Sequence, residues 1–205
     1  IKLLKLRHEV VGIDNMNNYY DVNLKKKRLK ELNKFSNFKF LKVDIKNKKL
    51  LKKKLGRFKP EIIINLAAQA GVRFSIKHPQ NYIDSNITGF LNILELAKKN
   101  KIKHLVYASS SSIYGDNNKF PFNEKEITDK PLSIYGVSKK TNELMAYSYS
   151  SLFNIPTTGL RFFTVYGPWG RPDMALFIFV NKMLKKLPVN LFNYGNMIRD
   201  FTYID

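Results

Sequence analysis

Short apolar segments that end in polar or small residues alternate with helix-like segments along this chain, and this alternation most constrains its fold. Strand-like runs are expected at residues 10–14, 38–44, 61–68, 104–108 and 157–163. Helical spacing of apolar residues predicts helices over 22–34, 47–56, 81–100 and 135–152. Alternation of this kind indicates right-handed βαβ units, and therefore an α/β protein with a parallel sheet.

The carboxyl ends of the expected strands carry polar or small residues such as Asp14, Asp44 and Ser109. Ligands of open parallel sheets bind beyond these ends, so a binding site is predicted there. After Gly167 the pattern becomes irregular and rich in proline, which indicates the start of a second, smaller region.

The composition excludes several other classes of protein. With 44% hydrophobic and 25% charged residues, the chain has enough apolar side chains for a full core. No apolar run approaches the roughly 20 residues that a membrane span needs. The chain has no cysteine, and His8, His78 and His104 are too scattered to suggest a metal site, so none is expected. A cytoplasmic protein is expected.

The formal net charge of +20 raises the question of nucleic acid. However, the cations are 29 Lys against 7 Arg, and Arg is the residue suited to bidentate recognition of phosphates and bases. The lysines are spread over several segments without interleaved aromatic residues, unlike a platform for single strands. Frequent Lys, Asn and Ile indicate an AT-rich coding sequence, and no specific nucleic-acid partner is predicted.

Tyr135 and Lys139 carry the strongest chemical signal. They are four residues apart, so they lie on the same face of the expected helix. A cation beside a phenol lowers its pKa from about 10, and such a phenolate can accept a proton from a sugar hydroxyl. The serines at 109–112 follow a strand and can supply a hydroxyl for the same reacting oxygen.

The sequence here resembles a known family, the NAD-dependent epimerase/dehydratases among the extended short-chain dehydrogenases/reductases, and most of all UDP-glucuronate 4-epimerases. The resemblance covers essentially the whole chain. Its motifs are 12–15 (GIDN), 66–73 (LAAQAGVR), 109–112 (SSSS), 135–139 (YGVSK), 161–174 (RFFTVYGPWGRPDM) and 199–205 (RDFTYID). It implies a Rossmann-like, doubly wound parallel sheet in an α/β fold, with NAD as cofactor.

The resemblance also implies a fragment. The family's first strand and Gly-rich loop would precede Ile1, so the sheet is expected to be truncated at its N-terminal strand. We expect residues 1–167 to form the NAD-binding region and 168–205 to form part of a smaller region that binds the nucleotide sugar.

The family's cofactor contacts map onto strand ends and one helix. Asp14 should accept hydrogen bonds from the adenosine ribose and repel a 2′-phosphate, which favours NAD over NADP. Ala67 and Ala68 should let the cofactor approach the backbone, although ordinary helix packing also explains small residues there. The full set implied by the resemblance is Asp14, Asn15, Asp44, Ile45, Leu66, Ala67, Ala68, Asn86, Tyr135 and Lys139. For Asn86, a buried structural amide is the alternative.

The resemblance implies that Tyr135 is the acid/base, with Lys139 holding the nicotinamide ribose. Ser110 is the choice for the hydroxyl that orients the sugar O4, with the neighbouring serines as alternatives. The expected substrate contacts are Ser111, Ser112, Thr164, Arg171 and Arg199. Arg171 should bind the carboxylate of a uronic acid, unless it forms a structural ion pair, and Arg199 should bind the UDP diphosphate.

The predicted reaction is C4 epimerisation of UDP-glucuronate to UDP-galacturonate through a 4-keto intermediate, for use in polysaccharide biosynthesis. UDP-glucose 4-epimerase is the nearest alternative. Related dehydratases and decarboxylases carry acids in the serine cluster, where this chain has Ser111 and Ser112. A noncatalytic polyanion-binding domain is the alternative from another class. By resemblance, a homodimer through the two long helices near 84–100 and 136–152 is expected.

Overall fold

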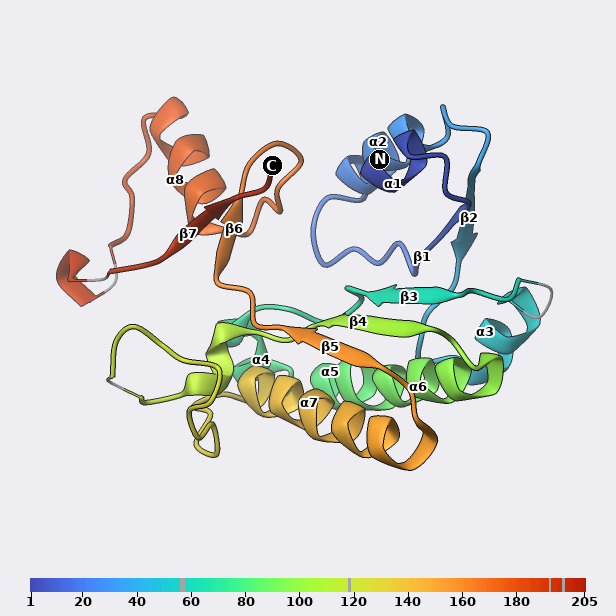
Figure 1. The fold of residues 1–205 in the computed structure, drawn as a ribbon. Helices are drawn as coiled ribbons and strands as arrows, with labels where there is room; N and C mark the ends of the chain where they lie inside the picture. Colours follow the sequence, from blue (N-terminus) through green and yellow to red (C-terminus); the bar gives the residue numbers. More distant parts are fainter. Residues whose placement is uncertain (56–57, 118, 192, 197) are drawn as a thin grey trace. The chain divides into compact units, whose positions relative to one another are not determined.

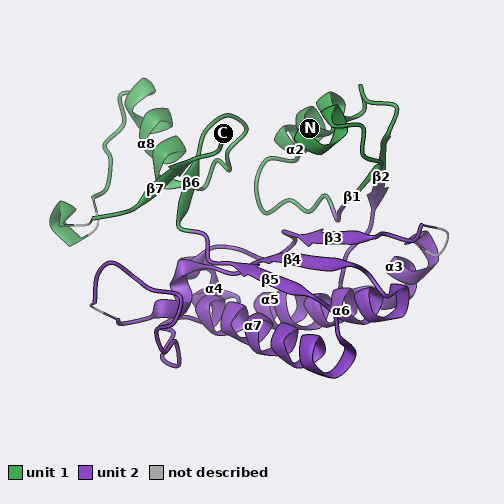
Figure 2. Ribbon diagram, viewed as in Figure 1, with its two compact units in different colours: residues 1–12, 16–40, 163–205 green, residues 13–15, 41–162 purple. Residues whose placement is uncertain are grey.

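A computed structural model describes residues 1–55, 58–117, 119–191, 193–196 and 198–205. The chain forms two compact units (Figure 2), which are described separately. Unit 1 contains residues 1–12, 16–40 and 163–205, and unit 2 contains 13–15 and 41–162. The expected functional division after Gly167 stays a prediction.

Strands and helices alternate through most of the chain (Figure 1). The strands are β1 (Val10–Asp14), β2 (Phe38–Lys42), β3 (Ile62–Asn65), β4 (His104–Ala108), β5 (Thr157–Leu160), β6 (Thr164–Tyr166) and β7 (Phe201–Tyr203). The α-helices are α1 (Lys2–Lys5), α2 (Val22–Leu32), α3 (Lys48–Leu55), α4 (Val72–Lys77), α5 (Pro79–Tyr82), α6 (Gly89–Asn100), α7 (Ile134–Phe153) and α8 (Ala175–Leu184). Three shorter helices are the π-helix η1 (Ile83–Thr88) and the 3₁₀-helices η2 (Ser111–Tyr114) and η3 (Asn193–Gly195).

Unit 2 is built on a parallel sheet in the order β3-β4-β5. The register pairs Ile63 with Leu105, and Leu105 with Thr157. Helices α4 to α7 lie along one face of this sheet (Figure 1). This arrangement confirms the predicted α/β architecture with parallel strands, since parallel neighbours require crossover connections that place helices over the sheet.

The core of unit 2 lies between the sheet and its helices. Tyr82, Phe90, Leu94, Leu105 and Ile113 are among its fully buried side chains. They come from α5, α6, β4 and η2, so the same core supports the carboxyl end of β4 and the helices beside it.

Unit 1 contains a second parallel pair, β6 with β7, in which Thr164 lies opposite Phe201. Strands β1 and β2 form a two-stranded sheet. Helix α8 carries apolar side chains such as Leu176, Ile178 and Val180 that are about two-fifths exposed. Among the described residues, no helix is both long enough and apolar enough to cross a membrane.

Several predicted elements differ from the structure. The helix expected over 81–100 is interrupted by the wider turns of η1, which place the Asn86 side chain in the interior. The strand expected over 61–68 ends at Asn65, and the one expected over 157–163 ends at Leu160. The region expected to be irregular after Gly167 contains α8, whose apolar run at 175–180 was not assigned to any predicted element.

Candidate active site

Helix α7 presents Tyr135 and Lys139 in its first two turns. The helix begins where Ser133 Oγ accepts a hydrogen bond from Gly136 N at 3.0 Å, which satisfies one of the unpaired amides of the first turn. Tyr135 is half-buried, and its ring contacts the buried ring of Tyr82 edge to face at 6.0 Å. The aromatic contact therefore supports the tyrosine at the point where α7 begins.

Lys139 is buried, with 4% of its surface exposed. Its Nζ donates to the backbone carbonyl of Ala108, the last residue of β4, at 2.8 Å. Burial lowers the pKa of Lys139 to about 8, because the charged form is poorly solvated there. The lysine thus joins α7 to the strand end that carries the serine cluster.

The four serines after β4 have different environments. Ser109 and Ser110 are buried, whereas Ser111 and Ser112 are half-buried. Ser109 Oγ donates to Glu143 Oε1 at 2.6 Å. Ser110 Oγ accepts from Ser112 N at 3.2 Å and caps η2. The Ser109 proton is therefore committed to a carboxylate within the protein.

Asn86 lies at the centre of a buried amide network. Its Oδ1 accepts from Gln69 N at 2.7 Å, and its Nδ2 donates to Gln69 O at 3.0 Å and to Ser138 Oγ at 2.9 Å. Asn142 Nδ2 donates to Asn86 O at 2.6 Å. This network connects the segment after β3 to α7, as the structural alternative for Asn86 requires, and direct contact of this amide with a cofactor stays a prediction.

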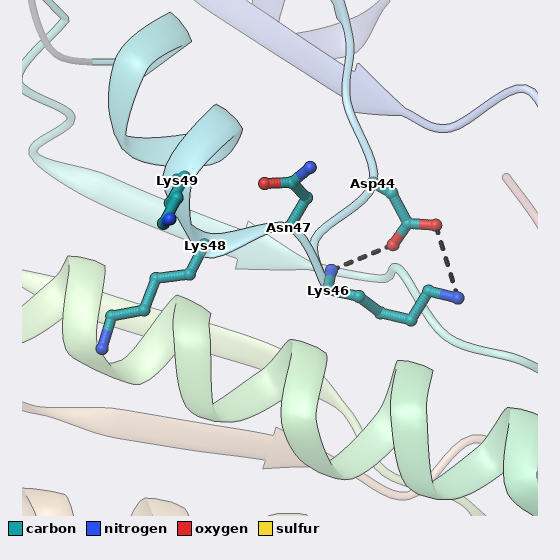
Figure 3. A pocket seen from close by; sticks show the side chains of 5 residues that line it. All are labelled: Asp44, Lys46, Asn47, Lys48 and Lys49. Atoms are coloured by element: carbon teal, nitrogen blue, oxygen red, sulfur yellow. Dashed lines mark hydrogen bonds and ion pairs between the residues drawn. The ribbon is translucent and has the colours of Figure 1, made fainter.

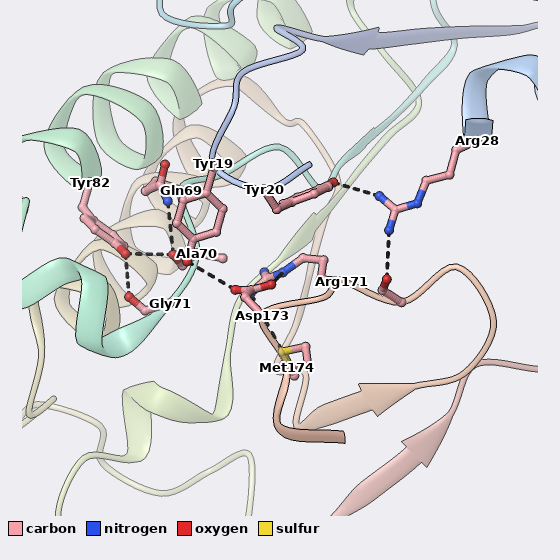
Figure 4. Close-up of polar contacts among 11 residues, drawn as sticks. Tyr19, Tyr20, Arg28, Gln69, Ala70, Gly71, Tyr82, Arg171, Asp173 and Met174 are labelled. Carbon is pink, nitrogen blue, oxygen red and sulfur yellow. Dashed lines mark hydrogen bonds and ion pairs between the residues drawn. The ribbon is translucent and has the colours of Figure 1, made fainter. Parts of the chain in front are cut away.

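The segment after β3 is held in place by Tyr82. The Tyr82 hydroxyl lies 2.8 Å from Ala70 O and 2.5 Å from Gly71 O (Figure 4). Upstream of these carbonyls, Leu66, Ala67 and Ala68 are exposed. The two alanines are therefore exposed at the carboxyl end of β3, and their contact with a cofactor stays a prediction.

The ends of β1 and β2 meet within unit 2. Asn15 Nδ2 donates to Asp44 Oδ2 at 3.0 Å, and Val43 N donates to the carbonyl of Asp14 at 3.1 Å. The side chain of Asp14 is exposed, whereas Ile45 is buried. Ile45 packs so closely on Gly89 that a Cβ at position 89 would lie 2.8 Å from the Ile45 side chain. The structure thus brings the predicted residues Asp14, Asn15 and Asp44 together.

An open, basic hollow adjoins Asp44 (Figure 3). It is lined by Asp44, Lys46, Asn47, Lys48 and Lys49. Asp44 Oδ1 accepts from Lys46 N at 2.9 Å, and the Lys46 ammonium lies 3.8 Å from Asp44 Oδ2. The carboxylate is thereby fixed at the start of the loop that leads into α3.

The remaining predicted residues lie in unit 1. Arg171 binds Asp173 through two hydrogen bonds, Nε to Oδ1 at 2.9 Å and Nη2 to Oδ2 at 2.7 Å (Figure 4). The Tyr19 hydroxyl contacts Asp173 Oδ2 at 3.3 Å, and burial raises the pKa of Tyr19, with a further contribution from the Asp173 charge. The predicted specificity residue is therefore paired with a carboxylate of its own chain.

Thr164 and Arg199 lie at the start of the β6–β7 pair. Thr164 N donates to the carbonyl of Asp200 at 3.3 Å, and Arg199, the residue before Asp200, is exposed. The pairing brings these two predicted substrate contacts close to each other. Among the residues that the structure describes, no three His, Asp or Glu side chains are placed to hold a metal ion.

Sequence reasoning missed Glu143, which accepts a hydrogen bond from Ser109, and Arg161, which donates two hydrogen bonds to Glu143. Glu143 follows Lys139 by four residues, so helical spacing alone places it on the same face as Tyr135 and Lys139. Arg161 follows β5, and no spacing rule connects it to α7.

The fold and these strand-end residues define a parallel α/β protein with a candidate site beyond the carboxyl ends of its strands. A profile of the NAD dependent epimerase/dehydratase family matches residues 2–205. The chain belongs to this family.

Two relatives and one solved structure illustrate the similarity. The chain is 55% identical to Protein CapI of Staphylococcus aureus and 50% identical to a probable UDP-glucuronate 4-epimerase of Rhizobium meliloti, over all of its own length. It spans 61% and 60% of these relatives. The crystal structure of UDP-glucuronic acid 4-epimerase from Bacillus cereus, in complex with UDP-glucuronic acid and NAD, matches with a TM-score of 0.90 and 37% identity. That match covers 98% of this chain and 63% of the other, and it confirms the Rossmann-like fold class.

Proposed function

We propose that the full-length protein is an NAD-dependent epimerase that inverts C4 of a UDP-sugar, with UDP-glucuronate as substrate and UDP-galacturonate as product. One observation carries the proposal: Lys139, one turn after Tyr135, donates to the carbonyl of Ala108 next to the serine cluster. The acid/base helix and the strand-end hydroxyls are thereby joined in one unit. Family membership and the relatives' names support the same chemistry.

The residues at the strand ends fit a dinucleotide. Asp14 has an exposed carboxylate that can accept hydrogen bonds from ribose hydroxyls. Ala67 and Ala68 are exposed and carry only methyl groups, so a cofactor can approach their backbone. We assign Asn15, Asp44, Ile45, Leu66 and Asn86 to the surroundings of NAD. When bound, NAD accepts a hydride from C4 of the sugar and later returns it.

The proton steps are assigned to α7 and the serine cluster. Tyr135 accepts the O4 proton, Lys139 favours the phenolate of Tyr135 and holds the nicotinamide ribose, and Ser110 orients O4. Ser110 is preferred to Ser109, because the Ser109 hydroxyl donates to Glu143. Ser111 and Ser112 are assigned to the sugar. After the 4-keto sugar rotates in the site, C4 would regain the hydride on its opposite face and Tyr135 returns the proton to O4, so the reaction involves no net redox change.

Substrate selection is assigned to residues of unit 1. Arg171 and Thr164 hold the C5 carboxylate of the uronate, and Arg199 binds the diphosphate of UDP. Arg171 must then exchange Asp173 for the substrate, which a side chain that is one-third exposed can do. A 4-keto uronate is a β-keto acid that can lose carbon dioxide. Holding its carboxylate out of alignment opposes that loss.

We further propose a homodimer formed through α6 and α7. Leu91 of α6 and Leu144, Tyr147 and Leu152 of α7 are exposed apolar side chains that such an interface would cover.

The proposal also keeps 1–167 as the NAD-binding region and 168–205 as part of the sugar-nucleotide region. It places the protein in the cytoplasm, with its product used for polysaccharide synthesis.

The test uses the full-length protein with UDP-glucuronate and no added NAD, with products followed by NMR. UDP-galacturonate is expected, and Tyr135→Phe should lower the rate by about 10²- to 10⁴-fold. Failure to convert UDP-glucuronate, even with added NAD, would reject the uronate substrate, and conversion of UDP-glucose would then assign the alternative epimerase. Release of carbon dioxide as the main outcome would identify a decarboxylase. Full activity of the Tyr135→Phe variant would reject the assigned mechanism.

A further inference from the structure

Arg161 follows β5 at the point where the sheet reaches the serine cluster. On one side of it, Leu160 O accepts from Ser109 N at 2.8 Å. On the other side, Phe162 O accepts from Ser111 N at 2.9 Å. The parallel pairing of β4 with β5 therefore continues beyond both strands, and Arg161 lies between two backbone hydrogen bonds to the serines.

The Arg161 side chain joins three segments of unit 2. Its Nε and Nη2 donate to the two carboxylate oxygens of Glu143, each at 3.0 Å. Its Nη1 donates to the Tyr114 hydroxyl at 3.1 Å and to the carbonyl of Glu124 at 3.0 Å. The paired side chains are only 19% and 16% exposed. A bidentate pair with these extra partners fixes both position and orientation.

Two consecutive residues at the end of β4 bond to two consecutive turns of α7. Ala108 O accepts from Lys139, and Ser109 Oγ donates to Glu143. The second of these contacts depends on Arg161, because Arg161 orients the carboxylate that Ser109 reaches.

We propose that the Arg161–Glu143 pair is a positioning clamp for the serine cluster. It holds Ser109 against α7, and therefore sets where Ser110 stands relative to the helix that carries Tyr135 and Lys139. This role rests on the proposed epimerase function, in which Ser110 and Tyr135 act on one sugar hydroxyl. Arg161 and Glu143 themselves act only through these neighbours.

The positive charge of the clamp belongs to Arg161. The hydrogen bonds that Arg161 donates to Glu143 raise the pKa of Arg161 above its ordinary value, so the guanidinium keeps its charge. Burial raises the pKa of the neighbouring Tyr107 to about 12, and the Glu143 charge contributes to this shift.

The first test measures local opening by hydrogen exchange in the full-length protein. Glu143→Gln keeps the shape of the side chain but removes the charge that pairs with Arg161. We expect amides of residues 109–114 to exchange about 10-fold faster or more, whereas amides of 90–97 in α6 keep their wild-type rates. Glu61→Gln is the matched control, because it removes an exposed ion pair with Lys103 at the other end of the sheet. Unchanged exchange at 109–114, or equal acceleration throughout unit 2, would overturn the clamp.

The second test separates positioning from binding. Glu143→Gln should lower kcat for UDP-glucuronate by about 10- to 100-fold and change KM by less than about 3-fold. Arg161→Lys, which keeps the charge but not the fork, should retain more activity than Arg161→Met. A change confined to KM, or equal loss in both Arg161 variants, would contradict positioning. If the wild-type protein converts no UDP-sugar, the proposed function fails, and the exchange experiment still decides whether the clamp exists.

Discussion

Unit 1 and unit 2 each contain an arginine that binds a carboxylate through two hydrogen bonds, but the two pairs differ in sequence separation and in exposure. Arg161 reaches Glu143 across 18 residues of sequence, from the end of β5 to α7. Arg171 reaches Asp173, two residues away, within one loop. The side chains are 19% and 16% exposed in the first pair and 33% and 30% exposed in the second.

The difference indicates what each pair can do. Releasing Glu143 would leave a poorly solvated carboxylate and disturb the contacts of Arg161 with Tyr114 and Glu124. Asp173 is more exposed; it pairs with Arg171 within the loop and also accepts from the Tyr19 hydroxyl at 3.3 Å. A carboxylate of a ligand can therefore replace Asp173 with little disturbance of the fold. The long-range pair suits a fixed support, and the local pair suits a binding residue.

The largest effect on stability is expected when the buried Arg161–Glu143 pair is broken. Arg161→Met should lower the free energy of unfolding by about 3 kcal/mol, because it leaves Glu143 without its cation in a poorly solvated place. Arg171→Met should cost less than about 1 kcal/mol, as expected of a partly exposed local pair. Urea unfolding of both variants, each compared with wild type, measures the difference. Equal losses would remove the distinction between the pairs.

Burial of Lys139, which donates to the carbonyl of Ala108 next to the clamp, should make stability depend on pH. Folded Lys139 loses its proton near pH 8, whereas in the unfolded chain it keeps the proton to about pH 10.4. Between these values the unfolded state binds more protons, so the free energy of unfolding rises with pH, by at most about 1.4 kcal/mol per pH unit.

Urea unfolding between about pH 7 and about pH 10, with Lys139→Met as reference, measures this contribution. The difference between wild type and variant should rise with pH above about pH 8. A flat difference would show that Lys139 is not desolvated in the folded protein.

The third prediction concerns specificity. Arg171→Ala should lower kcat/KM for UDP-glucuronate by about 10- to 100-fold, because it removes a charged bidentate contact with the substrate carboxylate. The same variant should change kcat/KM for UDP-glucose by less than about 3-fold, since that sugar has no carboxylate. Steady-state kinetics on both sugars measures the ratio, and an equal loss on both would make Arg171 a structural residue.

The smallest effect is expected at an exposed pair. Lys103 Nζ lies 2.6 Å from Glu61 Oε2, and this contact lowers the pKa of Glu61. Both side chains are largely exposed, so solvent and salt screen the attraction. Thermal unfolding of Glu61→Gln should show no measurable change in midpoint at physiological salt. A clear drop in the midpoint would show that the exposure of an ion pair does not predict its contribution to the stability of this protein.

Much of unit 2 could be predicted from sequence, because its signals are local. The alternation of short apolar runs with helix-like segments predicted β3, β4 and β5 as parallel strands. The four-residue spacing of Tyr135 and Lys139 predicted that they share one helix face. Asn15 and Asp44, both assigned to the cofactor by the family resemblance, contact each other in the structure. In each case the pattern concerns residues that are close in sequence or that share a sheet edge.

What sequence could not predict depends on packing between distant segments. The Arg161–Glu143 pair exists only because α7 lies against the end of β5. Asn86 points inward because η1 widens the helix, and no residue type between 83 and 88 marks that turn. For Arg171 the sequence left a substrate carboxylate and a structural ion pair as alternatives, and the structure shows a pair with Asp173.

The most direct test of the proposed chemistry follows the hydrogen at C4. UDP-glucuronate deuterated at C4 is incubated with the full-length protein in ordinary water, and the product is analysed by NMR and mass spectrometry. Transfer of a hydride within the site, with Tyr135 moving only the O4 proton, predicts UDP-galacturonate that retains its deuterium at C4. Loss of the deuterium to water would contradict the account, because C4 would then exchange as a proton rather than move as a hydride.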